Sequence, residues 1–250
     1  MLAIISDLHS NLEALTAVLE DSAAFTVQRT VCLGDVIGYG PNPRETLELT
    51  DRCDFVLMGN HEQGLQDDGA MKFNERARNA LEWTRSELNS KAHTRESNRA
   101  LWDRIERMPH SRQEGDLLFV HASPRAPIEE YILPKDTLNL EEMASIFRSF
   151  DGRVAFGGHT HVPGVIREGY TFAHQSDFDG WFALPAEKTL VNVGSVGQPR
   201  DGQNTACYVL LDGDRMQFRR VVYDFRTTMK KIRSVSKLDE FLARRLQVGQ

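Results

Sequence analysis

Residues 2–13, LAIISDLHSNLE, contain the strand, the loop and the helix start that decide the fold. Leu2 to Ser6 form an apolar run of the kind that becomes a buried strand. Ser10-Asn11-Leu12-Glu13 matches a capping box and predicts the start of a helix. Asp7 and His9 lie between the two signals. The stretch therefore predicts a strand, loop and helix unit with two potential metal ligands at the carboxyl end of the strand.

The same pattern repeats along the next fifty residues. Thr30 to Leu33 is a second strand candidate, Pro43 to Arg52 a helix with proline in its first turn, and Phe55 to Met58 a third strand. Alternating strands and helices predict a largely parallel sheet with right-handed crossovers.

Residues 63–115 differ from this pattern and predict a helical insertion. Charged residues dominate, and apolar residues recur at helical spacing over Asn74–Ser90 and Arg95–Met108. We expect Trp83 and Trp102 to pack the insertion onto the body of the protein rather than to stack on a substrate.

After Gly115 the sequence predicts a helix at Asn139–Phe150 and strands at 117–121, 153–156, 164–167, 189–193, 206–211 and 216–223. Turns such as Asp212-Gly213-Asp214 are typical of antiparallel hairpins, which we place in a second sheet. The expected fold class is α/β: a single domain over 1–250, a four-layer α-β-β-α sandwich of two mixed sheets flanked by helices, with the helical insertion at 63–115 and a basic C-terminal helix at 224–250.

The composition, 40% hydrophobic and 26% charged, is that of an ordinary globular protein. No apolar run approaches the roughly 18 residues that span a bilayer, and residues 1–5 lack a signal-peptide core, so we expect a cytoplasmic protein without a membrane partner. Cys32, Cys53 and Cys207 are odd in number and widely spaced, which predicts reduced packing residues.

The net charge of −6 hides a basic segment, because residues 215–250 hold ten Arg and Lys against three acidic residues. A nucleic-acid surface is one interpretation. We favour the other, a strand and helix docked on an acidic body, because no aromatic residues interleave the charges to stack bases.

Five short motifs follow predicted strands: Asp7-Leu8-His9, Gly34-Asp35, Gly59-Asn60-His61-Glu62, His121 and Gly158-His159-Thr160-His161. Ligands of open α/β sheets bind beyond the carboxyl ends of the strands, so one crevice could gather all five motifs. Their histidines, aspartates and asparagine form the nitrogen and oxygen ligand set that divalent transition metals accept. Each motif alone is common by chance, whereas the ordered set predicts a metal site.

In that order, the motifs resemble the signature of the calcineurin-like metallophosphoesterase superfamily: D-x-H, G-D, G-N-H-[DE], H and G-H-x-H. The GSVGQPR segment at 194–200 and the insertion resemble its small bacterial and archaeal phosphodiesterase branch. The resemblance covers most of the chain. It is specific for fold and metal site but not for substrate, because the same blocks serve diesterases, monoesterases and nucleases.

The resemblance implies a dinuclear centre of Mn, Fe, Zn, Ni or Co, with manganese a typical occupant. One metal would be held by Asp7, His9 and His161, the other by Asn60, His121 and His159, with Asp35 bridging the two. A bridging hydroxide would attack phosphorus, since two dications lower the pKa of a shared water. About two net positive charges would remain for an anionic phosphate.

By the same resemblance, His61 faces the scissile phosphate as a general acid or transition-state donor. Some relatives orient this histidine with an aspartate after the Gly-Asp block, whereas residues 35–40, DVIGYG, offer none. Whether Glu62 supports His61 stays open. Arg200, beside turn glycines near a strand end, is a candidate phosphate-binding residue, with a plain glycine-rich turn as the alternative.

We therefore expect a hydrolase of small phosphate esters, with diesters favoured over monoesters and the oligomeric state open. Two alternatives are a binding or scaffold protein of the same fold without turnover, and a nuclease that grips nucleic acid with its basic tail. Substrate choice should rest on the insertion and on the loops around Tyr39 and Arg200.

Overall fold

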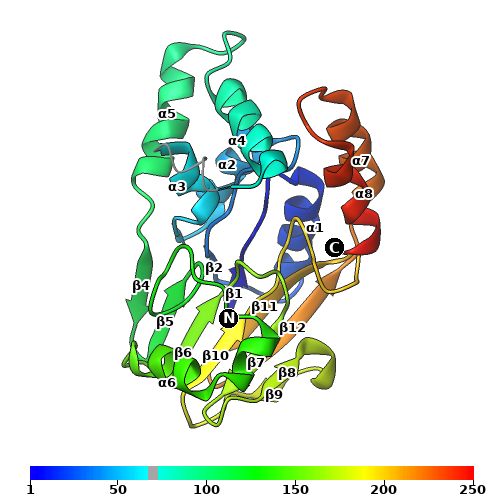
Figure 1. Cartoon of the computed structure of the whole chain (residues 1–250). Helices are drawn as coiled ribbons and strands as arrows, with labels where there is room; N and C mark the ends of the chain where they lie inside the picture. Colours follow the sequence, from blue (N-terminus) through cyan, green and yellow to red (C-terminus); the bar gives the residue numbers. More distant parts are fainter. Residues whose placement is uncertain (67–72) are drawn as a thin grey trace.

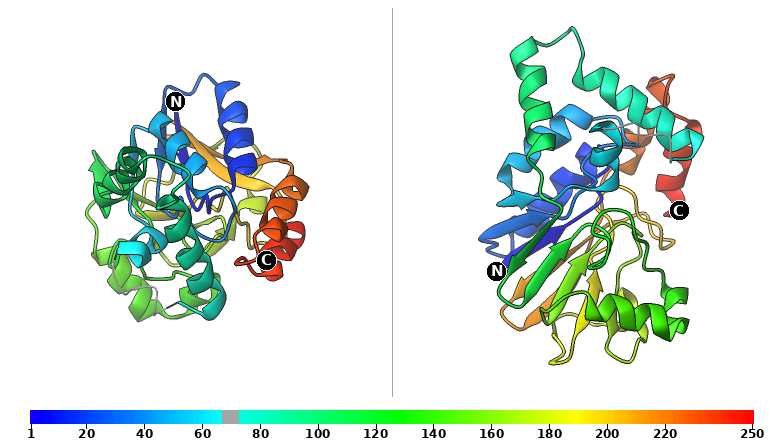
Figure 2. Two further views of the ribbon diagram at one scale, coloured as in Figure 1. Left: turned by 90° about the horizontal axis from the view of Figure 1, so that it is seen from above. Right: turned by 60° about the vertical axis from the view of Figure 1, so that its left-hand side comes forward.

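Two six-stranded sheets lie face to face between helices in the computed structural model, which describes residues 1–66 and 73–250 (Figure 1). Side chains from both sheets, including Ile4, Leu33, Phe119 and Phe156, form one apolar cluster between them. The two layers are separated most clearly in the right-hand view of Figure 2. The expected sandwich of two mixed sheets flanked by helices is confirmed.

The first sheet has the order β3-β2-β1-β11-β12-β9. Its strands are β1 (Leu2–Ile5), β2 (Arg29–Cys32), β3 (Phe55–Val56), β9 (Phe182–Ala183), β11 (Ala206–Asp212) and β12 (Arg215–Val221). β1, β2 and β3 are parallel, as expected, whereas β11 pairs antiparallel with β1 and with β12.

The second sheet has the order β4-β5-β6-β10-β7-β8. Its strands are β4 (Ser111–Glu114), β5 (Leu117–Val120), β6 (Val154–Gly157), β7 (Gly164–Arg167), β8 (Phe172–His174) and β10 (Thr189–Asn192). The prediction that all later strands join this sheet is wrong for β11 and β12. Turn chemistry fixes which strands are neighbours in a hairpin, but it does not fix the sheet that the hairpin joins.

The helices are α1 (Leu12–Ala23), α2 (Pro43–Leu49), α3 (Asn60–Gln66), α4 (Glu75–Leu88), α5 (Arg95–Glu106), α6 (Leu140–Arg148), α7 (Phe225–Ser234) and α8 (Glu240–Val248). α1 packs Leu15 and Val18 against the outer face of the first sheet. α6 packs Met143 and Phe147 against the outer face of the second. None of the described helices combines the length and the apolar character that a membrane crossing requires.

Two predicted helix boundaries need correction. α1 is capped by Asn11, whose side chain accepts a hydrogen bond from the Ala14 N–H at 3.2 Å, and not by Ser10. Residues 224–250 form two helices, α7 and α8, rather than one, because Asp239 caps a new start after the extended Val235.

The insertion consists of α4 and α5 as predicted, but it ends in an unpredicted strand, β4, which pairs with β5. Trp83 packs against the apolar cluster of α7 and α8, outside the insertion, as predicted. Trp102 packs against the main apolar cluster and donates a hydrogen bond to Asn89 of the insertion at 3.1 Å. The insertion and the C-terminal helices gather at the same end of the sheets (Figures 1 and 2).

The basic segment is also docked on the body. Arg219 pairs with Asp21 at 2.8 Å, and Lys231 pairs with Glu13 of α1. These contacts agree with the interpretation of a docked strand and helix.

Candidate metal centre

The predicted ligand residues converge at the carboxyl ends of β1, β2, β5 and β6 and at the start of α3. The backbone there is unusual, because residues at the centre adopt left-handed conformations with φ between 46° and 63°: Asp7, His9, Asp35, His159 and His161. Such strain in residues other than glycine is concentrated at functional sites. Each strand end turns sharply and directs its side chain into one buried cluster.

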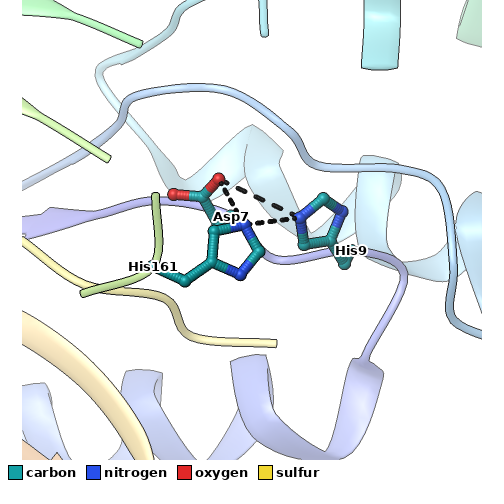
Figure 3. Close-up of side chains that lie close together, drawn as sticks. All are labelled: Asp7, His9 and His161. Atoms are coloured by element: carbon teal, nitrogen blue, oxygen red, sulfur yellow. Dashed lines mark hydrogen bonds and ion pairs between the residues drawn. The ribbon is translucent and has the colours of Figure 1, made fainter. Parts of the chain in front are cut away.

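Asp7, His9 and His161 form a first group whose ligand atoms all lie within 4.8 Å of one another (Figure 3). His9 Nε2 and His161 Nε2 are 3.1 Å apart, and Asp7 Oδ1 is 3.1 Å from His161 Nε2. The other Asp7 oxygen accepts a hydrogen bond from the His159 N–H at 3.0 Å. Oδ1 of Asp7 is thereby left directed at the two imidazoles.

Asp35, His121 and His159 form a second group of the same kind. His121 Nε2 lies 3.1 Å from His159 Nδ1 and 3.1 Å from Asn60 Oδ1. The structure therefore brings Asn60, at the first position of α3, to the two histidines with which the family resemblance grouped it.

Asp35 lies between the two groups. Its Oδ2 is 3.7 Å from His9 Nε2 and 3.5 Å from His121 Nε2, while its Oδ1 accepts the His61 N–H at 2.9 Å. A Cβ at Gly59 would lie 2.1 Å from Asp35 Oδ1, so the glycine of the third motif lets the two loops approach. This placement suits a carboxylate shared by two ions.

Hydrogen bonds to backbone carbonyls fix the tautomers of three histidines. His9 Nδ1 donates to Ile37 O at 3.2 Å, His121 Nδ1 donates to Leu33 O at 3.1 Å, and His161 Nδ1 donates to Gln198 O. A carbonyl can only accept, so Nδ1 carries the proton and Nε2 presents a lone pair. Such outer contacts orient imidazoles toward a metal.

Burial lowers the pKa of every histidine in the cluster. The pKa of His161 falls to about 4 and that of His159 to about 3, and those of His9, His61 and His121 are also lowered by burial. The imidazoles are neutral at pH 7, the form that binds metal.

The acceptor atoms of the cluster fit divalent cations. Lone pairs of His9 and His161 face each other, and Asp7 Oδ1 has no hydrogen-bond donor among the described residues. Burial, with the neighbouring Glu62 and Asp7 carboxylates, raises the pKa of Asp35 well above its usual range. A dication between these groups would relieve both the lone-pair and the carboxylate repulsion.

Glu62 is fully buried and holds the two loops that carry Asp35 and Asn60. Its Oε2 accepts the N–H groups of Asp35 and Gly59, each at 2.9 Å, and its Oε1 accepts the Ile37 N–H at 3.1 Å. Burial raises the pKa of Glu62 to about 7, against these three hydrogen bonds. Glu62 therefore positions backbone, and its described contacts do not include the His61 ring.

His61 lies beside the centre, with its Nε2 4.0 Å from Asp35 Oδ2, and it also falls in a third group of possible ligands with His9 and Asp35. Its Nδ1 has no hydrogen-bond partner among the described residues. Gly38 lies opposite this nitrogen, and a Cβ there would approach it to 2.1 Å. The Gly38 loop therefore presents no carboxylate to His61 Nδ1, as its sequence indicates.

A cavity of about 550 Å³ opens over the cluster. Its described lining includes His61, Arg200, Tyr39, Phe73 and Tyr131. Arg200 donates to Gln198 Oε1 at 2.8 Å, while its buried Nε has no acceptor among the described residues. Arg200 is therefore brought to the same cavity as the groups of possible metal ligands.

The calcineurin-like phosphoesterase superfamily domain matches residues 1–216 of this sequence. The chain belongs to this superfamily. Membership implies a phosphoester hydrolase that uses divalent metals, in agreement with the His and Asp groups described above. The resemblance seen in the motifs is confirmed.

Similar proteins cover the full chain. An uncharacterized protein, MJ0912 of Methanocaldococcus jannaschii, is 35% identical over all of this chain and 98% of its own. A metallophosphoesterase structure from Sphaerobacter thermophilus is 35% identical, with a TM-score of 0.81 over 100% of this chain and 99% of that one. The hypothetical protein PH1004 from Pyrococcus horikoshii OT3, at 22% identity and a TM-score of 0.76 over 100% and 99%, shares the fold.

Sequence reasoning missed Phe73 and Tyr131, which line the cavity. Neither belongs to a motif, and no periodic pattern distinguishes them from packing residues. The sequence also did not indicate the role of Glu62. Its hydrogen bonds to backbone N–H groups depend on how two separate loops pack together.

Proposed function

We propose that this protein is a dinuclear metal-dependent phosphodiesterase for small substrates. The observation that carries the proposal is the position of Asp35 between two groups of buried acceptors at the floor of a small-molecule cavity. The first ion would be held by Asp7, His9 and His161, the second by Asn60, His121 and His159. Two divalent ions, with manganese the first candidate, would polarise the phosphoryl oxygens and lower the pKa of a coordinated water toward neutrality.

His61 is the proposed donor to the substrate. It lines the cavity beside the ligands, and its ring is held by contacts with His9 and Tyr39 at centroid distances of 4.8 and 4.5 Å. Because burial keeps the imidazole neutral, it donates a hydrogen bond from one nitrogen to a phosphoryl or leaving-group oxygen.

The charge of the cavity favours diesters. Arg200 is the single Lys or Arg in its described lining, which also includes Glu129. A monoester dianion needs more cationic partners than a diester monoanion. One guanidinium in addition to the two ions therefore suits the diester, and Arg200 is the proposed contact for a non-bridging oxygen.

The test is turnover after metal stripping and reconstitution with Mn²⁺. We expect bis(p-nitrophenyl) phosphate to be cleaved faster than p-nitrophenyl phosphate. His61→Asn should lose on the order of 100-fold in kcat, as expected for a positioned donor. The matched control is His93→Asn, which changes an exposed histidine that is not among the described lining residues of the cavity.

Full diesterase turnover in His61→Asn would contradict its assigned role. Absence of diester cleavage by the reconstituted protein would overturn the proposed activity, and faster cleavage of the monoester would reverse the stated preference.

A further inference from the structure

Three aromatic rings line the cavity. Tyr39 follows β2, Phe73 precedes α4, and Tyr131 follows β5. Each ring contacts an imidazole of the centre. The ring centroids of Tyr39 and Phe73 lie 4.5 Å and 5.1 Å from that of His61. The ring centroid of Tyr131 lies 3.9 Å from that of His159. All three rings therefore adjoin the site where the ester bond would be cleaved.

Tyr131 is the most accessible of the three rings. The residue is 51% exposed, whereas Tyr39 and Phe73 are partly buried. One side of the Tyr131 ring packs on His159, and the rest is open to the cavity and solvent. A large ring left open beside a catalytic cavity offers a stacking surface to a ligand.

Arg200 lies next to this ring. Both residues line the cavity, and the Arg200 guanidinium interacts with the Tyr131 hydroxyl. The guanidinium keeps a buried Nε without an acceptor among the described residues. A guanidinium group and an aromatic ring are therefore close to each other in the same cavity.

Arg200 and Tyr131 together favour a phosphate ester that carries a planar group. A cavity of about 550 Å³ accommodates a small molecule. A phosphate ester with a saturated organic group would satisfy Arg200 but leave the ring uncovered, whereas a planar group would stack on it. Stacking of a planar base on an aromatic side chain is a recurrent source of affinity that tolerates differences in the identity of the base.

We infer that Tyr131 and Arg200 together recognise a phosphate ester that carries a planar aromatic group, with the phosphate on Arg200 and the ring on Tyr131. The inference rests on the proposed function and narrows its substrate class to aryl or nucleobase-bearing esters.

Calorimetric titration of the Mn²⁺-loaded protein with two phosphonates, which cannot be hydrolysed, tests this inference without turnover. Phenylphosphonate and methylphosphonate share the anionic group and differ in the planar ring. We expect phenylphosphonate to bind about tenfold more tightly, which corresponds to about 1.4 kcal/mol.

Three variants test whether Tyr131 and Arg200 cause the preference for phenylphosphonate over methylphosphonate. Tyr131→Phe keeps the ring and should keep the tenfold ratio. Tyr131→Leu keeps apolar bulk without the aromatic face, and its ratio should fall to about twofold or less. Arg200→Gln should weaken both phosphonates by a similar factor and leave the ratio unchanged.

Equal affinity of the wild-type protein for the two compounds, or a tenfold ratio that survives in Tyr131→Leu, would overturn the inference and leave the proposed hydrolysis standing. Loss of the ratio in Tyr131→Phe would also overturn it, because the hydroxyl rather than the ring would then select the ligand. Failure to bind either phosphonate would contradict the inference together with the proposed anion site.

Discussion

Replacing Gly38 by alanine should displace His61 without changing any proposed metal ligand. The new Cβ would lie 2.1 Å from His61 Nδ1, so the ring must retreat by about 1.3 Å to reach the 3.4 Å of ordinary van der Waals contact. The rings of His9, Tyr39 and Phe73 surround His61 and restrict that movement. A misplacement of about 1 Å costs on the order of 100-fold in rate, and this is the loss of kcat that we expect.

The matched control is Gly169→Ala. Both glycines have a positive φ, 88° at Gly38 and 98° at Gly169, but a Cβ at Gly169 meets nothing within 4 Å. Each variant should lose about 1 to 2 kcal/mol of stability from left-handed strain, and only Gly38→Ala should lose turnover. Measurements of kcat with bis(p-nitrophenyl) phosphate, of bound metal and of the melting temperature separate these effects.

A kcat of Gly38→Ala within threefold of the wild type, at unchanged metal content, would contradict this prediction. The position of the His61 ring would then be immaterial to turnover. A loss of bound metal in Gly38→Ala would instead show that the loop, rather than His61, carries the effect.

Three further predictions concern the support of the centre. Glu62→Gln should weaken Mn²⁺ affinity by about 10- to 100-fold in calorimetric titration, since an amide cannot accept all three N–H groups that Glu62 binds; unchanged affinity would contradict its role. Chelation of metal at first held at about 100 times its Kd should lower the unfolding free energy by about 2.7 kcal/mol in denaturant titration, and an unaltered midpoint would refute metal binding to the folded state. The metal-free protein should lose stability as the pH falls from 6.5 toward 4, because burial lowers the folded-state pKa of His159 to about 3 and of His161 to about 4, so the unfolded chain takes up protons first; stability that stays constant between pH 7 and 5 would contradict those shifts.

Much of the site could be predicted because short stretches of sequence identify its residues. Each motif directly follows an apolar run, and a parallel sheet brings the carboxyl ends of its strands to one edge. Asp7, Asp35, His121 and His159 accordingly occupy neighbouring strand ends of two packed sheets. Two hydrogen bonds in the cluster, from the His159 N–H to Asp7 and from the His61 N–H to Asp35, link motifs that are far apart in the chain.

By itself, the sequence determined every described strand except β4, β8 and β9, the main helices and the identities of the residues that converge. Periodicity and residue chemistry are properties of short segments. Only the tertiary structure decided that β11 pairs with β1, that Glu62 binds three backbone N–H groups, and that Gly38 faces His61. The same holds for Tyr131 beside Arg200, which is 69 positions away in the chain. Such contacts depend on how separate loops pack against one another, and no local pattern in the sequence specifies that packing.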